Sequence, residues 1–92
     1  MSMNKLESRQ QLLVITMEEC GELIQECSKA LRKQDLFEQQ NLKDEIGDVY
    51  AMINLLVEND VVSWTDLEDR GDYKKNKLKK WSDLVWVSIE KI

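Results

Sequence analysis

The sequence contains no histidine and no proline, and only three glycines and two cysteines among its 92 residues. Without histidine, the chain has no His-ligated zinc site and no imidazole to act as a general base. Because proline breaks helix interiors, its absence favours long helices. No apolar run approaches the length of a membrane span, and the N-terminus lacks an apolar signal core. We therefore expect a cytoplasmic protein with no membrane partner.

Acidic residues outnumber basic ones by 18 to 13, giving a net charge of −5. A protein that binds nucleic acid nonspecifically needs a basic surface, so no nucleic-acid partner is expected. The negative charge does not exclude a nucleotide as the substrate, provided that cations screen its phosphates. The length predicts a single domain over residues 1–92 with a small core, which favours oligomerisation.

Cys20 and Cys27 are seven residues apart on a predicted helix. Two helical turns separate them by about 10 Å, too far for a disulfide between them. We expect both to be buried free thiols in a reducing compartment.

Capping signals and apolar spacing predict an all-α fold, an antiparallel helical bundle of about four helices. Ser8 is the expected N-cap of the first helix, with Asn4 as the alternative for an earlier start, and Asp35 and Ser63 are the expected N-caps of the second and third helices. Asn59 is expected to end the second helix in a left-handed conformation. Gly71 is expected to end the third helix, and Asp72 to cap the last. The predicted helices cover residues 9–33, 36–58, 64–70 and 73–91, the last with strand-forming residues near its end. The second helix is apolar on more than one side, which indicates a second packing partner and an assembly completed by oligomerisation, as a homodimer or homotetramer.

Two pairs of carboxylates occur at a spacing of three residues, Glu19 with Glu22 and Glu45 with Asp48. Residues three apart are neighbours on a helix surface. In an antiparallel hairpin that pairs positions adding to 67, Glu19 faces Asp48 and Glu22 faces Glu45. Four carboxylates at one level suit a hard divalent cation, Mg²⁺ or Mn²⁺ as a substitute. A solvated acidic face is the simpler interpretation of any single pair.

These motifs resemble a known family. Glu-Glu-x-Gly-Glu-Leu from Glu18, followed by Glu-Ile-Gly-Asp-Val from Glu45, is similar to the MazG-like branch of the all-α nucleoside triphosphate pyrophosphohydrolases. The resemblance covers residues 9 to 81 and is closest to the small, often phage-borne members. It implies Mg²⁺-dependent hydrolysis of nucleoside triphosphates to the monophosphate and pyrophosphate, in a bundle of two or more chains.

The resemblance also implies roles for individual residues. The metal ligands and catalytic residues would be Glu19, Glu22, Glu45 and Asp48. The substrate-binding residues would come from a lysine-rich stretch of the last helix: Lys74, Asn76, Lys77 and Lys80. The arginine that many members carry in this stretch is missing here.

Two other functions compete with this interpretation. The first is a non-catalytic acidic helical module that oligomerises or binds a partner through its apolar faces. The second is a metal-dependent phosphohydrolase that releases orthophosphate. Metal titration and product analysis separate these possibilities.

Overall fold

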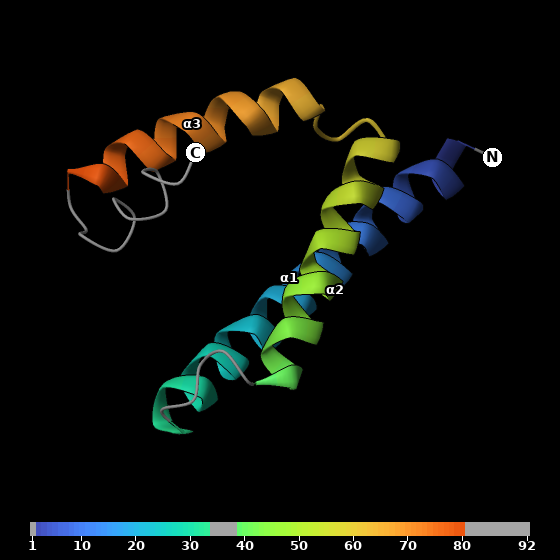
Figure 1. Ribbon diagram of the computed structural model, residues 1–92. Coiled ribbons are helices and arrows are strands. Elements are labelled where there is room, and N and C mark those ends of the chain that lie inside the picture. The colour runs from blue at the N-terminus through green and yellow to red at the C-terminus, as the bar shows by residue number, and fades with distance from the viewer. Residues whose placement is uncertain (1, 34–38, 81–92) are drawn as a thin grey trace. The chain divides into compact units, whose positions relative to one another are not determined.

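The computed structural model describes residues 2–33 and 39–80, with the side chains of α1 described from Glu7 on. Within these ranges the protein forms three helices and no strand: α1 Ser2–Lys33, α2 Gln40–Glu58 and α3 Trp64–Lys79 (Figure 1). The predicted all-α class is confirmed. In this part of the chain, no helix combines the length and apolar character needed to cross a membrane.

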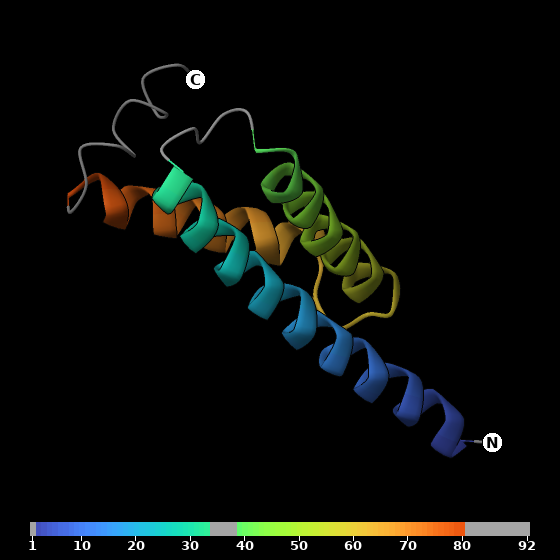
Figure 2. The same cartoon turned by 90° about the horizontal axis from the view of Figure 1, so that it is seen from below.

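The helices belong to two compact units, residues 1–61 with α1 and α2, and residues 62–92 with α3. In the first unit, α1 and α2 lie side by side and run in opposite directions, as both views show (Figures 1 and 2). This is the predicted antiparallel hairpin. Its register decides which side chains of the two helices meet.

The contact face of each helix follows a spacing of alternately three and four residues, which keeps side chains on one stripe of a helix. On α1 these buried or half-buried positions are Arg9, Leu12, Thr16, Glu19, Leu23, Glu26 and Ala30. On α2 they are Leu42, Glu45, Val49, Met52 and Leu56. We call these two sets the contact faces. They include several polar and charged side chains, so the hairpin interior is not a purely apolar core.

The apolar core of the described residues is small. Ala30 and Met52 are its only buried apolar side chains. Cys20 and Cys27 are exposed free thiols, so the prediction that they are buried is wrong. The physical reason is that the apolar arc of α1 is wider than the stripe that α2 covers.

The first residues predicted for α1 and α2 both differ from those in the structure. α1 begins at Ser2, so the expected cap Ser8 and its alternative Asn4 both lie inside the helix. No proline or glycine interrupts residues 2–20, and the helix therefore continues through the capping signal. α2 begins at Gln40, because Gln39 is extended with φ −83° and ψ 97°. The predicted start at residue 36 and the proposed cap Asp35 lie outside the described residues.

α2 ends after Glu58 as predicted, but the left-handed residue beyond it is Asp60 and not the predicted Asn59. Asp60 has φ 60°, whereas Asn59 has φ −100°. The Val61 N–H donates to the Leu56 carbonyl at 2.9 Å, and the Asp60 N–H donates to the Val57 carbonyl at 3.0 Å. These two bonds form the Schellman arrangement, which satisfies carbonyls at the helix end.

α3 is one continuous helix where two were predicted. Its start is as predicted: the Ser63 hydroxyl accepts a hydrogen bond from the Asp66 N–H, and the Asp66 carboxylate accepts one from the Ser63 N–H. Gly71 and Asp72 lie inside the helix, so Gly71 does not end it. A glycine costs a helix interior only about 1 kcal/mol relative to alanine, which a continuous ladder of hydrogen bonds can offset. The predicted extension to residue 91 lies outside the described residues beyond Lys80.

Candidate functional site

Three carboxylates from the two hairpin helices converge on one point. Glu19 and Glu22 come from α1 and Glu45 comes from α2, and one oxygen of each lies within 4.8 Å of the others. We call these three residues the acidic group. It contains the Glu22 and Glu45 pair that the predicted register sets opposite each other. Asp48 is exposed and is not part of the group, so its role as a fourth ligand stays a prediction.

Glu45 is the one buried charged side chain in the described part of the chain, with 6 % of its surface exposed. Its Oε2 atom and the Oε2 atom of Glu19 are both buried and have no hydrogen-bond partner. Burying an unpaired carboxylate oxygen is costly unless a proton, a donor or a cation compensates it. Three carboxylates on two rigid helices, two of them with unpaired oxygens, fit a hard divalent cation that prefers oxygen ligands.

The same crowding changes the protonation of Glu45. The adjacent Glu19 carboxylate, burial, and the nearby Glu22 raise the pKa of Glu45 from 4.5 to about 8. Each of these influences disfavours the charged form of a carboxyl group. At neutral pH and without a cation, Glu45 therefore holds a proton that a cation would displace.

The acidic residues beside the group have other environments. Glu26 pairs with Lys29 on its own helix at 3.4 Å. Asp44 accepts a hydrogen bond from the Gln40 amide at 2.7 Å. Glu18 is exposed and lies outside the group. Sequence spacing alone does not separate these acids from the acidic group, because it gives no information on where the partner helix packs.

Three of the four predicted substrate-binding residues share a hollow in the second unit. Asn76, Lys77 and Lys80 line a cavity of about 370 Å³ together with Tyr73. Lys74 is exposed and does not line this cavity. The Arg70 guanidinium lies 4.3 Å from the centre of the Tyr73 ring, in cation–π geometry. Sequence reasoning did not identify this contact, which places a further positive charge beside the cavity-lining tyrosine.

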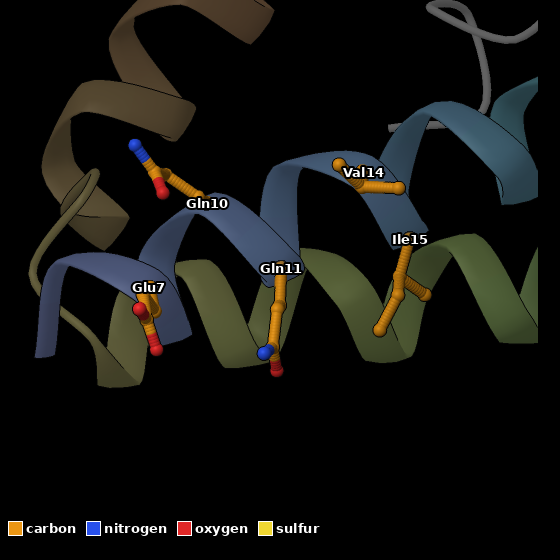
Figure 3. A pocket seen from close by; sticks show the side chains of 5 residues that line it. All are labelled: Glu7, Gln10, Gln11, Val14 and Ile15. Carbon is orange, nitrogen blue, oxygen red and sulfur yellow. The ribbon is translucent and has the colours of Figure 1, made fainter. Parts of the chain in front are cut away.

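A further hollow, of about 460 Å³, lies on the N-terminal half of α1 (Figure 3). Its lining residues are Glu7, Gln10, Gln11, Val14 and Ile15. In Figure 3, Gln10 and Val14 point to one side of the helix, and Glu7, Gln11 and Ile15 point to the other. None of the predicted site residues lines this hollow, and we assign no chemistry to it.

Comparison with known proteins gives one assignment. No curated protein and no solved structure matches the chain significantly. A family model does match, over residues 4–82, which is most of the chain and includes every residue of the acidic group. The chain belongs to the family of the MazG nucleotide pyrophosphohydrolase domain.

Proposed function

We propose that the protein hydrolyses nucleoside triphosphates, with ribose or deoxyribose, to the monophosphate and pyrophosphate in the presence of Mg²⁺. The observation that carries this proposal is the convergence of Glu19, Glu22 and Glu45 within 4.8 Å. Family membership supports it, because the matched domain is a nucleotide pyrophosphohydrolase domain. Water adds to the α-phosphate, the bond to the β-phosphate breaks, and pyrophosphate leaves.

Glu19, Glu22, Glu45 and Asp48 would hold the cation. A bound Mg²⁺ supplies the positive charge that neutralises phosphate oxygens during such a displacement. The two helices provide a rigid frame, since each ligand projects from a helix interior and not from a loop. Glu45 gives up its proton on binding a cation, which makes affinity for the cation rise with pH. A carboxylate of the set accepts the proton of the attacking water.

The cavity of α3 supplies the chemistry that recognises a triphosphate. Lys77 and Lys80 offer point charges to phosphate oxygens, and Asn76 offers an amide donor. Tyr73 offers an aromatic surface on which a base can stack. The acidic group itself contains no positively charged member, so basic residues such as these would add to the positive charge that a bound cation supplies.

A substrate screen tests the proposal. The protein is incubated with each common NTP and dNTP and Mg²⁺, and pyrophosphate and orthophosphate are measured separately. Release of pyrophosphate with an equal amount of monophosphate, abolished by a chelator, is expected. Orthophosphate as the first product would indicate the rival phosphohydrolase. A protein that releases neither product and binds no divalent cation at defined stoichiometry would instead be a non-catalytic helical module.

A further inference from the structure

The arginine of α3 lies on an aromatic ring and has no acidic partner in the described part of the chain. The Arg70 guanidinium is 4.3 Å from the centre of the Tyr73 ring. Among the described residues, the one ion pair joins Lys29 and Glu26 of α1, so Arg70 forms none there. The charge of Arg70 is therefore available to an anionic ligand.

The neighbouring sequence explains why no acid neutralises Arg70. Asp66 lies four residues earlier, at the spacing that favours an ion pair on a helix. Its carboxylate accepts a hydrogen bond from the Ser63 N–H at 3.1 Å, as part of the capping box that begins α3. Asp69 and Asp72 lie one and two residues from Arg70, spacings at which helix side chains do not face each other.

Stacking on a ring leaves the hydrogen-bond donors of an arginine free. The guanidinium contacts the ring through its flat face, whereas its N–H groups lie in the plane of the group and point outward. Tyr73 thus positions the charge of Arg70 without using a donor. The planar fork of donors matches the oxygens of a phosphate group, whereas a lysine supplies only a point charge.

Arg70 begins a positively charged stripe of α3. Tyr73, Lys77 and Lys80 follow it at intervals of three, four and three residues, which keeps the four side chains on one side of the helix. We call these four residues the basic stripe. Its last three members line the cavity of about 370 Å³ with Asn76, and no acidic side chain of the described residues lines it. Arg70 does not line the cavity and extends the positive charge beyond Tyr73.

The hollow on the opposite side of α3 does not suit a phosphate. Gly71 lines that hollow and precedes Tyr73 by two residues, which sets the two about 160° apart around the helix. Glu68 and Asp72 also line it, and their carboxylates repel an anion. Of these two hollows, the one on the basic stripe is therefore the one that fits phosphate.

We propose that Arg70 binds the terminal phosphate group of the nucleoside triphosphate, and that Tyr73 positions Arg70 for this contact. The inference rests on the proposed function, because it assigns a further contact to the same substrate. Lys77 and Lys80 bind the phosphates that lie in the cavity, and Arg70 binds the phosphate that extends past Tyr73. Arg70 and Lys77 are about 10 Å apart along the helix axis. Both have long side chains that can converge on one chain of phosphates.

This assignment gives Arg70 a role that the lysines do not have. The stretch from Lys74 to Lys80 contains no arginine, and Arg70 is the one arginine of α3. A chain of two phosphates that occupies the cavity is too short to extend past Tyr73. Arg70 therefore favours a chain of three phosphates over a chain of two.

Calorimetry with inorganic tripolyphosphate and pyrophosphate tests the contact without catalysis. The titrations are made in chelator at low ionic strength, so that no divalent cation at the acidic group contributes and screening is weak. Arg70→Met should weaken the binding of tripolyphosphate by about 10-fold, the size expected for one charge-assisted contact. The affinity for pyrophosphate should change little. Equal losses for the two anions overturn the assignment of Arg70 to the terminal phosphate.

Three further variants separate the contact from general charge and from structure. Arg32→Met is the matched control, since Arg32 is an exposed arginine of α1 whose Nη1 donates to the Ser28 hydroxyl at 3.1 Å. It should bind tripolyphosphate as the parent does. Arg70→Lys should recover only part of the loss, because an ammonium lacks the fork of donors. Tyr73→Leu should weaken binding because the guanidinium loses the ring that positions it.

The results that overturn the proposal are equally specific. Circular dichroism checks that each variant keeps the helicity of the parent. A parent that does not bind tripolyphosphate overturns the proposal, and so does an Arg70→Met variant that binds it as well as Arg32→Met does. A Tyr73→Leu variant with the affinity of the parent overturns the positioning role of Tyr73.

Turnover separates failure of this inference from failure of the proposed function. Arg70→Met should raise the KM for the triphosphate by about 10-fold and change kcat little, since the contact is made in the ground state as well as in the transition state. Pyrophosphate release with an unaltered KM in Arg70→Met overturns the Arg70 contact and leaves the proposed function intact. A parent that releases no pyrophosphate overturns the proposed function, and a loss of tripolyphosphate binding in Arg70→Met would still support the anion contact.

Discussion

Two sides of α1 differ in the side chains that they carry. The contact face against α2 carries Thr16, Glu19 and Glu26, although it is the side that the fold encloses. A second stripe of α1 carries no charge, although it is a side left open: Leu13, Met17, Cys20, Ile24, Cys27 and Leu31. A chain that only needed a stable hairpin would place its apolar stripe inside, because burial of apolar surface drives folding. The enclosed carboxylates therefore have a cost for folding, which supports the proposal that they bind a cation.

The largest expected effect comes from breaking the acidic group. Glu22→Gln should lower pyrophosphate release by at least about 100-fold, since loss of even an indirect metal contact costs up to that much. It should also relieve repulsion among the carboxylates. The melting temperature in chelator should therefore be equal to or above that of the parent, and the increase on adding Mg²⁺ should be lost.

Glu18→Gln is the matched control, because Glu18 is an exposed glutamate on the same helix and outside the group. It should keep both turnover and the response to Mg²⁺. If Glu22→Gln retained its turnover, the acidic group would have no catalytic role, and the contrast between the two sides of α1 would lose its functional meaning.

Asp48→Asn tests whether Asp48 belongs to the cation site. Asp48 lies one turn beyond Glu45 but is exposed and outside the acidic group. If it completes the ligand set on cation binding, the variant should lose about 10-fold or more in turnover and in Mg²⁺ affinity. Isothermal titration and product assays measure the two losses. Full retention of both would restrict the site to the three residues that converge in the structure.

Lys77→Ala tests whether the positive charge needed for phosphate comes from α3. The variant should raise the KM for the triphosphate by about 10-fold, the size expected for one charge-assisted contact, and should leave Mg²⁺ affinity unchanged. Lys79→Ala is the control, since Lys79 is on the same helix but does not line the cavity. Equal effects of the two substitutions would indicate a general electrostatic influence and no specific contact.

The remaining prediction concerns stability without metal. Glu45 has a pKa of about 8 in the folded protein and near 4.5 when unfolded. Between these values the folded state holds one more proton than the unfolded state. Its free energy of unfolding therefore falls as pH rises through this window, and levels off above it. Melting curves in chelator should show this decline from about pH 5 to about pH 8.

Glu45→Gln should flatten this part of the profile, because the proton that couples folding to pH is removed. Glu18→Gln should keep the slope of the parent. An unchanged slope in Glu45→Gln would mean that Glu45 does not hold the proton.

Local sequence signals predicted much of the fold correctly. The Ser63 and Asp66 box starts α3 where expected, and α2 ends at Glu58. These features depend on backbone groups within a few residues, so nearby side chains decide them. Ser8 and Gly71 were misjudged because a capping or breaking signal competes with a helix that is already propagating. Each extra residue adds a hydrogen bond at small cost, and the longer helix prevails.

The sequence by itself determined that the chain is helical, that Glu19 with Glu22 and Glu45 with Asp48 share helix faces, and that a hairpin can oppose the two pairs. These properties follow from the period of the helix and the position of the break between its arms. Only the tertiary structure decided that Glu45 is enclosed while Asp48 is exposed, and that Cys20 and Cys27 face outward. Burial depends on the direction from which α2 approaches α1. That direction is set by the packing of all contact residues together and cannot be obtained from the spacing of any one motif.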